Sequence, residues 1–453
     1  MKQEKQIDMV GGNLWRNIFR YSLPLMFSNV LQVVFNISDI AVVGTFSGES
    51  ALGSVGSTTI LVTLLTGILL GMGGGVNAEV ALWVGAEDDR RVSNTVHTSF
   101  LLCLLTGLLL LAAGLLSVRG ILVCMHTKEE LLGGAVTYLR IYLLGCPALA
   151  LYNFGNGILS AIGDTRRPLI YLSIAGVVNV ALNLLFVIVF QLSVAGVALA
   201  SVISQYLSAV LVLRSLCRSK GAYALRLKDI RLHPTAVRRM LRIGIPSALQ
   251  YVMFAVANLF IQAAVNYFQP VVVEGNSAAA NADTLTYDVM AAFYTACTSF
   301  IAQNYGAGNR RRIMQTYGIT LLYALAAGAF LGGAFFLLHR PFLHLFAQSE
   351  EVIGYGVIRL KIMACSYWIS AFMDNATAAA RGLGKTVVPT IIVVMGTVVF
   401  RIIWIYTVFA YFHTLDSLYL LYACAWILTA AAGNFYFFRQ YRKLPENIHV
   451  PAV

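Results

Sequence analysis

Three polar side chains form a stripe in the first long apolar stretch of the chain. Gln32, Asn36 and Asp39 stand at i, i+4 and i+7, a spacing that places them on one face of a helix. Asn179 and Asn183 are one helical turn apart in a later apolar stretch, at a similar predicted depth. A carboxylate among amide oxygens can hold a proton, because loss of water favours its neutral form, or coordinate a hard cation such as Na⁺. A structural hydrogen-bond network between packed helices is the alternative interpretation.

The second half of the chain carries its polar groups in a different layout. Asn258 and Gln262 begin another i, i+4 stripe. Asp283 and Tyr287 form a further i, i+4 pair, and Asp374 lies alone in a later apolar stretch. These residues are candidates for a second ion site or for binding a cationic substrate, and packing between helices is the alternative.

Other charged residues in apolar stretches have simpler predicted roles. Glu79 lies shortly before a loop and is expected to reach the membrane surface or to pair with Arg90 or Arg91. Pairing with helix carbonyls or with a carboxylate is expected for three cations, Arg140, Lys361 and Arg401.

The composition shows what must position these residues. Of the 453 residues 58% are hydrophobic and 11% are charged, against about 25% charged in a soluble domain. This excludes a cytosolic enzyme, a disordered chain and a disulfide-stapled secreted module. A membrane-spanning helix needs about 20 mostly apolar residues. Twelve such helices are predicted, at 17–43, 54–83, 93–116, 131–160, 168–190, 194–216, 236–268, 276–304, 313–338, 352–380, 389–411 and 417–438.

The basic residues predict the orientation. If the N-terminus is cytoplasmic, 25 of the 32 Lys and Arg residues fall in inside segments, and three, Arg119, Lys128 and Arg340, fall outside. Both termini are therefore expected on the cytoplasmic side of the plasma (inner) membrane. The basic connector 217–235 is expected to lie on anionic lipid heads, so the charge of +12 does not indicate nucleic-acid binding.

The chain also repeats itself. Pro24 recurs as Pro246 and Gly85 recurs as Gly306, at almost the same spacing along the chain. Glycine and proline at loop corners in one register are difficult to obtain by chance. Six spans per repeat is an even number, so the two halves are expected to enter the membrane in the same direction. We predict an all-α membrane protein of two six-helix bundles related by a pseudo-two-fold axis along the membrane normal: an N-lobe at 1–216, the connector at 217–235 and a C-lobe at 236–453.

Several motifs resemble those of the multidrug and toxic compound extrusion (MATE) family of cation-coupled antiporters. They are Asn36-Ile-Ser-Asp39 with Val43-Gly44, Gly85-Ala-Glu-Asp-Asp-Arg-Arg91, Gly163-Asp-Thr-Arg-Arg-Pro168, Ala195-Gly-Val-Ala-Leu-Ala200, Gln303-Asn-Tyr-Gly-Ala-Gly-Asn309 and Arg381-Gly-Leu-Gly384. The resemblance covers essentially the whole chain. It implies twelve helices in two lobes, a V-shaped central cleft, and export of organic compounds against inflow of sodium or protons.

The resemblance also implies roles for individual residues. In similar prokaryotic proteins an aspartate matching Asp39 couples the ion, and here Asn36 stands beside it. An asparagine and an aspartate of the fifth helix assist it. Asn179 matches the first, but Asn183 replaces the second, which leaves Asp39 alone to titrate and puts sodium affinity in question. Some relatives use acidic residues of the C-lobe, for which Asp283 and Asp374 are candidates.

The function expected is therefore secondary active multidrug efflux. The exported compounds are expected to be amphipathic and often cationic, exchanged for protons or sodium as one bundle rocks against the other. A flippase for lipid-linked precursors or polysaccharides of the same superfamily is the alternative. Without a catalytic cluster or metal-ligand spacing, an enzyme is not expected. We expect no cofactor besides the coupling ion, membrane lipid and small organic molecules as partners, and a monomer.

Overall fold

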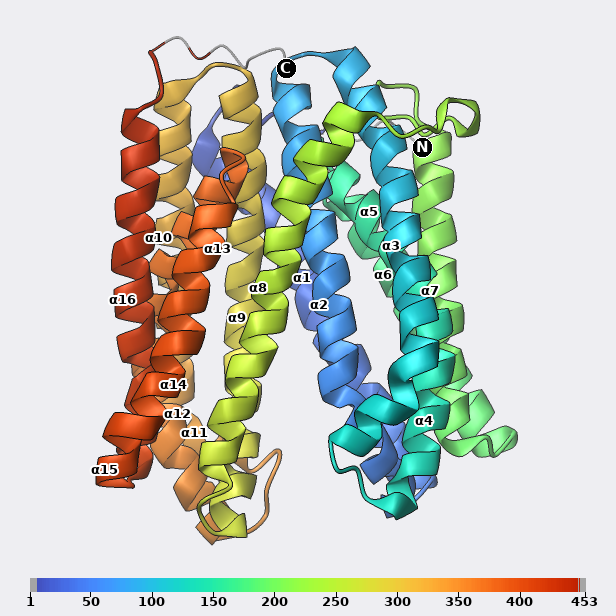
Figure 1. Cartoon of the computed structure of the whole chain (residues 1–453), viewed down its shortest axis with the longest axis vertical. Helices are drawn as coiled ribbons and strands as arrows, with labels where there is room; N and C mark the ends of the chain where they lie inside the picture. Colours follow the sequence, from blue (N-terminus) through green and yellow to red (C-terminus); the bar gives the residue numbers. More distant parts are fainter. Residues whose placement is uncertain (1–5, 447, 449–453) are drawn as a thin grey trace. The chain divides into compact units, whose positions relative to one another are not determined.

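The computed structural model describes residues 6–446 and 448, and this part of the chain is helical without β-strands. Each predicted span coincides with one long helix or with a series of consecutive helices, which confirms the all-α prediction (Figure 1). The segments of the first half are α1 (Leu14–Phe46), α2 (Glu49–Gly85), α3 (Asp89–Cys124), α4 (Glu129–Leu144) with α5 (Cys146–Ala161), α6 (Arg166–Leu184) and α7 (Ser193–Cys217).

The second half has the same succession of long helices. They are α8 (Pro234–Val265), α9 (Pro270–Gly306), α10 (Arg310–Leu337), α12 (Glu350–Gly382), the series α13 (Val387–Val393), α14 (Phe400–Trp404) and α15 (Ala410–Phe412), and α16 (Leu415–Arg442). A single turn, α11 (His339–Leu343), precedes α12. Most helices extend beyond the predicted apolar stretches, because polar and charged residues continue the helical turns at their ends.

Ten helical segments of the described chain are long and apolar enough to cross a membrane. An eleventh span is the pair α4 and α5, which bends by 45° at Gly145, where the sequence predicts one straight helix over 131–160. The twelfth, α9, has 37 residues but is less apolar, since it contains Glu274, Asp283 and Asp288 among many small polar residues. Length therefore qualifies α9 as a span, although its hydropathy does not.

Two spans contain π-helical turns. Leu185–Val189 continues α6, and Val394–Val399 and Ile405–Phe409 separate α13, α14 and α15. Single π-helical turns are frequent at functional sites because they turn side chains out of the regular helical register. The first of them begins shortly after Asn183.

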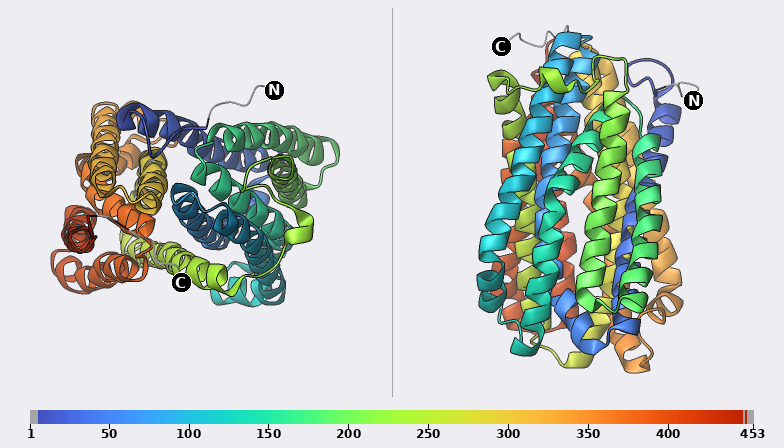
Figure 2. Two further views of the ribbon diagram at one scale, coloured as in Figure 1. Left: turned by 90° about the horizontal axis from the view of Figure 1, so that it is seen from above. Right: turned by 90° about the vertical axis from the view of Figure 1, so that its right-hand side faces the viewer.

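The described chain divides into two compact units, within each of which long helices run side by side (Figure 2). The first contains residues 6–7 and Phe27–Ala248, and the second contains Asp8–Met26, 249–446 and 448. Both α1 and α8 pass from one unit to the other shortly after an internal proline, Pro24 or Pro246. This division places the beginnings of α1 and α8 with the opposite halves, whereas the sequence predicts lobes at 1–216 and 236–453.

Corresponding corners of the repeat are built alike. Asp88 accepts a hydrogen bond from the Arg91 backbone N–H at 2.9 Å and caps α3. Its counterpart in the second half, Asn309, accepts one from the Arg312 backbone N–H at 3.2 Å and caps α10. The residue before each cap has a positive φ, 55° at Glu87 and 75° at Gly308. The shared geometry supports the repeat detected in the sequence.

Glycines bring α8 close to α2 within the first unit. A Cβ atom on Gly75 would lie 3.1 Å from the backbone of Gly244, which is closer than most Cβ contacts, so the two helices approach closely at these glycines. This contact fixes the beginning of α8 beside the end of α2.

Candidate functional site

The polar residues of the first half meet in one place. Asp39 on α1 is half-buried and faces Asn179 and Asn183 on α6, which are both buried. Ser201 on α7 closes the group. The i, i+4 spacing puts the two asparagines on one face of α6, where both are close enough to bond with the group.

Four hydrogen bonds join these residues in a ring. Asn183 Nδ2 donates to Asp39 Oδ1 at 2.5 Å and to Asn179 Oδ1 at 3.3 Å. Ser201 Oγ donates to Asp39 Oδ2 at 3.1 Å, and Asn179 Nδ2 lies 3.5 Å from Ser201 Oγ. We call Asp39, Asn179, Asn183 and Ser201 the polar ring.

The polar ring holds one formal charge and no cation. Among the described residues, neutral groups alone hydrogen-bond to the Asp39 carboxylate. Asn183 Oδ1 is a buried acceptor without a hydrogen-bond donor in the described chain. A carboxylate without a counter-ion and an unused acceptor suit an incoming proton or an oxygen-seeking cation.

The rest of the predicted stripe on α1 lies outside the polar ring. Gln32 and Asn36 are exposed, although the 3.6-residue period places them on the face of Asp39. Asn36 was predicted to assist the coupling ion, and the described contacts of Asp39 do not include it. The residues of α6 and α7 that hydrogen-bond to Asp39 do not reach the other two residues of the stripe.

Asp283 has a different environment in the second unit. Arg359 on α12 forms an ion pair with it through Nη2 and also donates to Asn276. The Tyr367 hydroxyl donates to the other Asp283 oxygen at 2.5 Å. A guanidinium in contact with the carboxylate neutralises it, which favours a packing role for Asp283 between α9 and α12.

Asp374 lines a separate small pocket of the second unit. The cavity measures about 70 Å³ and lies between α8, α9 and α12. Four aromatic side chains face it: Tyr251, Phe254, Tyr287 and Tyr294. Arg381, two helical turns after the buried Asp374, supplies one positive charge. The pocket thus combines aromatic surface with one acid and one base.

The other residues predicted to form a site in the second half do not lie together in the structure. Tyr287 lines the Asp374 pocket, whereas its predicted partner Asp283 bonds to Arg359. Asn258 is exposed, and Gln262 donates to Asn266 at 2.9 Å along its own helix. In the described part of the chain, no single second-half site contains all five candidates.

Glu79 pairs neither with Arg90 nor with Arg91. Its Oε1 accepts a hydrogen bond from Trp83 Nε1 at 2.8 Å and lies 3.6 Å from Nη1 of Arg239. The prediction was wrong because Arg239 comes from α8, which lies far away in the sequence and adjacent in space.

The three predicted cation pairs also turn out differently. Arg140 is exposed, Lys361 lies 5.9 Å from the ring centre of Phe336, and Arg401 lies 4.7 Å from that of Tyr422. Among the described residues, no group of three or more His, Cys, Asp or Glu side chains could hold a metal ion.

Sequence reasoning missed Ser201, Arg359 and Arg381. Serines are common in membrane helices, so Ser201 gives no separate signal. Arg359 lies inside the predicted span 352–380, and arginines inside spans often pair with a carboxylate, so its presence could have indicated the Asp283 pair. Arg381 was assigned to a cytoplasmic segment, but α12 continues through it.

The comparisons agree with this architecture. The family model described as MatE matches the chain twice, at residues 24–185 and 246–407, so the two matches begin at Pro24 and at its counterpart Pro246. Together they cover more than half of the chain and coincide with the repeat found from its glycines and prolines.

Similar curated proteins include transporters of bacteria. The probable multidrug resistance protein YpnP of Bacillus subtilis is 28% identical over 376 residues, which are 80% of this chain and 81% of YpnP. The probable multidrug resistance protein NorM of Thermotoga maritima is 24% identical, over 83% of this chain and 82% of NorM. An FAD transporter of Shewanella oneidensis is 22% identical, over 79% of this chain and 80% of its own length.

Solved structures share the fold. One, an outward-facing multidrug resistance MATE family transporter of the MOP superfamily, superposes with a TM-score of 0.91 at 22% identity, over 98% of this chain and 99% of its own. This agreement confirms the predicted fold of twelve membrane-spanning helices in two bundles.

Proposed function

Because this chain belongs to the MatE family of membrane transporters, we propose that it is a secondary active multidrug efflux antiporter. It exports amphipathic, often cationic organic compounds in exchange for protons or sodium. The exchange follows alternating access, in which one six-helix bundle rocks against the other. The polar ring carries this proposal, because it holds a carboxylate that no cation neutralises in the described chain.

In the proposed mechanism Asp39 alternates between an ion-loaded and a free state. In the free state the carboxylate is stabilised by donors from Asn183 and Ser201. When Asp39 takes up a proton it becomes a donor, and rotation of the Asn183 amide presents Oδ1 as the acceptor. Ion binding thereby changes the contacts among α1, α6 and α7. The ion consequently binds one of the two transport conformations more tightly than the other.

The polar ring favours a proton over sodium as the coupling ion. Na⁺ coordination prefers several oxygen ligands, and a second carboxylate would strengthen it. Here the second position is Asn183, and its Nδ2 rather than its oxygen faces Asp39. A proton needs one carboxylate oxygen and one acceptor, both of which the polar ring contains. No other cofactor is required.

The Asp374 pocket fits the proposed substrates. Aromatic rings bind flat apolar surfaces and attract cations, and Asp374 supplies a negative charge. Pockets for drug-sized ligands measure about 300–1,000 Å³, so a cavity of about 70 Å³ holds only part of such a compound. Substrate entry must therefore move Tyr251, Tyr287 or Tyr294.

The proposed setting is the plasma membrane, with both termini in the cytoplasm. The basic residues of the connecting segments support this orientation, since cytoplasmic loops carry an excess of Lys and Arg. We propose a monomer, with membrane lipid and small organic molecules as its partners.

The alternative is a flippase for lipid-linked precursors or polysaccharides. A pyrophosphate group would require several cations, and Arg381 is the one basic residue of the described chain that lines the Asp374 pocket. An assay of lipid-linked precursor translocation in proteoliposomes distinguishes this alternative from drug export.

The decisive experiment measures transport of an organic cation, ethidium, in proteoliposomes. Proton and sodium gradients are imposed separately on the wild-type chain and on Asp39→Asn. We expect a proton gradient to drive transport by the wild-type chain and to lose its effect on Asp39→Asn. Asp229→Asn, which removes an exposed carboxylate of the connector, serves as the control. Gradient-driven transport by Asp39→Asn at the wild-type rate would exclude Asp39 as the coupling residue.

A further inference from the structure

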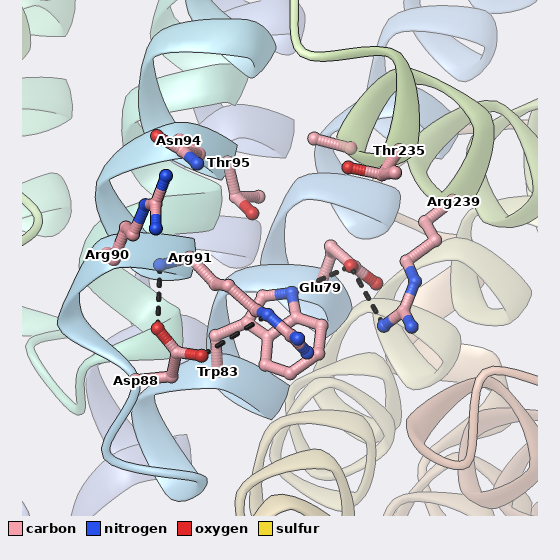
Figure 3. Close-up of a pocket in the computed structure, with 10 residues that line it drawn as sticks. Glu79, Trp83, Asp88, Arg90, Arg91, Asn94, Thr95, Thr235 and Arg239 are labelled. Carbon is pink, nitrogen blue, oxygen red and sulfur yellow. Dashed lines mark hydrogen bonds and ion pairs between the residues drawn. The ribbon is translucent and has the colours of Figure 1, made fainter. Parts of the chain in front are cut away.

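A second and larger cavity lies in the first unit, away from the polar ring. It measures about 300 Å³ and is enclosed by the end of α2, the beginning of α3 and the beginning of α8. Three arginines line it, Arg90, Arg91 and Arg239, together with Trp83 (Figure 3). Its volume is at the lower end of the range for small-ligand sites, about 300–1,000 Å³.

Both carboxylates of this cavity already have partners. Glu79, 2% exposed, accepts from Trp83 Nε1 at 2.8 Å and pairs with Arg239. Asp88 caps α3 and lies 3.2 Å from Nε of Arg91. A third arginine, Arg90, is exposed at the rim, and no carboxylate of the described chain forms an ion pair with it, so its guanidinium group is available to a ligand.

Trp83 orients two of the guanidinium groups. The Arg91 group lies 4.4 Å and the Arg239 group 4.8 Å from the centre of its indole ring. Stacking on an aromatic ring leaves the edge of a guanidinium available to donate hydrogen bonds. In Figure 3 the Arg90 side chain lies beside Asn94, a further donor at the same cavity.

The corresponding corner of the second unit is filled by the chain itself. Arg312, the counterpart of Arg91 in the repeat, donates to the Gly11 carbonyl at 2.9 Å and to the Gly12 carbonyl at 3.2 Å. Asn304, which corresponds to Trp83, donates to the Met9 carbonyl at 3.0 Å. Backbone carbonyls therefore take up these donors in the second unit.

In the first unit, the backbone segment that corresponds to Met9–Gly12 forms its hydrogen bonds with Thr98 instead of with the arginines. Arg231 corresponds to Met9, and its carbonyl accepts a hydrogen bond from Thr98 at 3.3 Å. His233 N–H donates to the same hydroxyl at 3.1 Å. Arg91 consequently has no backbone carbonyl among its described side-chain partners.

We infer that the cavity lined by Arg90, Arg91 and Arg239 binds a phosphate group. Planar guanidinium groups donate paired hydrogen bonds that match phosphate oxygens. In the proposed topology this corner faces the cytoplasm, so the phosphate comes from an anionic lipid of the inner leaflet or from solution. The proposed topology decides only where the phosphate comes from, and the binding of phosphate itself is inferred from the arginines.

The experiment uses the purified full-length chain in a neutral detergent, without any transport assay. Native mass spectrometry measures retention of dioleoylphosphatidylglycerol, and thermal unfolding measures stabilisation by inorganic phosphate. We expect Arg90→Gln to weaken binding about tenfold, equal to about 1.4 kcal/mol, because an exposed guanidinium loses a charge-assisted hydrogen bond to the phosphate. Arg90 has no ion-pair partner in the described chain, so its replacement leaves the folded state intact.

The matched control is Arg311→Gln, which changes the exposed counterpart of Arg90 in the repeat. Lipid retention that depends on Arg90 and resists inorganic phosphate identifies the lipid headgroup. Phosphate stabilisation that depends on Arg90, or displacement of the lipid by phosphate, identifies a soluble ligand. Equal binding of both probes by the wild-type chain and Arg90→Gln would overturn the inference, as would an equal loss in Arg311→Gln. These experiments measure binding and not transport. The phosphate site can therefore be confirmed or rejected whether or not the chain proves to be an antiporter.

Discussion

The polar ring and its counterpart in the second half have opposite chemistry. In the register set by Pro24 and Pro246, Asp39 corresponds to Ile261. In the register set by Gly85 and Gly306, the residues Asn179, Asn183 and Ser201 correspond to Phe400, Trp404 and Tyr422. All four counterparts belong to one apolar cluster in the second unit. The same place in the repeat is therefore a charged hydrogen-bond ring in one half and hydrophobic core in the other.

This difference shows which features of the repeat the fold requires. Helix lengths, corner caps and prolines recur in both halves, so they belong to the architecture. The polar ring does not recur, so the packing of these helices does not need it. A carboxylate in a membrane helix costs about 2.5–3.5 kcal/mol on insertion scales, and its presence in one half alone points to function.

The carboxylates of the second half lie at positions that do not correspond to Asp39 in the repeat. Asp283 is neutralised by Arg359, and Asp374 shares a pocket with Arg381. Asp39 differs from both because neutral groups alone surround its carboxylate in the described chain. Charge compensation therefore separates a packing role for Asp283 from the proposed coupling role of Asp39.

The largest effect on stability is expected from breaking the Asp283 pair. Arg359→Met leaves the half-buried Asp283 carboxylate without its cation, which costs about 3 kcal/mol, the lower end of the range for a broken buried pair. The melting temperature in detergent should fall accordingly, and the double variant with Asp283→Asn should recover most of the loss. Asp39→Asn should change the melting temperature much less. An equal fall in both single variants would remove the distinction between the two carboxylates.

A carboxylate placed in the apolar cluster should be nearly as harmful. Ile261→Asp has fewer free donors around it than Asp39. Phe400 offers no donor and Trp404 Nε1 already donates to the Ser417 carbonyl at 2.8 Å, which leaves the Tyr422 hydroxyl as the one donor among the three counterparts of Asn179, Asn183 and Ser201. We expect a loss of about 2.5–3.5 kcal/mol, measured by thermal unfolding. Ile261→Val, the control, should cost about 0.5–1.5 kcal/mol. A stable Ile261→Asp would show that the cluster tolerates charge.

A second carboxylate in the polar ring should alter the ion preference. In Asn183→Asp two carboxylates adjoin, and a cation relieves their repulsion. We expect Na⁺ to stabilise this variant against heat with an affinity about tenfold higher than for the wild-type chain, equal to about 1.4 kcal/mol. Asn258→Asp, at an exposed position of α8, is the control and should show no change. An unchanged response to Na⁺ would separate the polar ring from ion binding.

The smallest effect is expected from the hydroxyl of the polar ring. Ser201→Ala removes one donor to Asp39, and we expect a net loss of about 1 kcal/mol because Asn183 continues to donate to the same carboxylate. Transport at a limiting proton gradient should fall about fivefold. Ser204 donates to the carbonyl of its own helix at 2.9 Å, so Ser204→Ala should transport normally. Equal losses in both variants would indicate a general packing effect on α7.

Sequence alone was sufficient for the elements and for three of the four residues of the polar ring, Asp39, Asn179 and Asn183. Apolar runs of the length of a bilayer located eleven of the twelve spans, since α9 qualifies by length alone, and the spacing of Asn179 and Asn183 put both on one face of α6. Glycine and proline corners located the repeat that the two family matches confirm. These features are local, because each depends on residues within one helix or one turn.

Tertiary structure decided which side chains meet. The period of a helix gives the face of each residue but neither the rotation of the helix nor its neighbour. Asn36 therefore shares a face with Asp39 and still lies outside the polar ring, while Ser201 joins it from another helix. Glu79 pairs with Arg239 and Asp283 pairs with Arg359 for the same reason. A carboxylate inside the protein pairs with the cation that packing brings close to it, whatever the distance between the two along the chain.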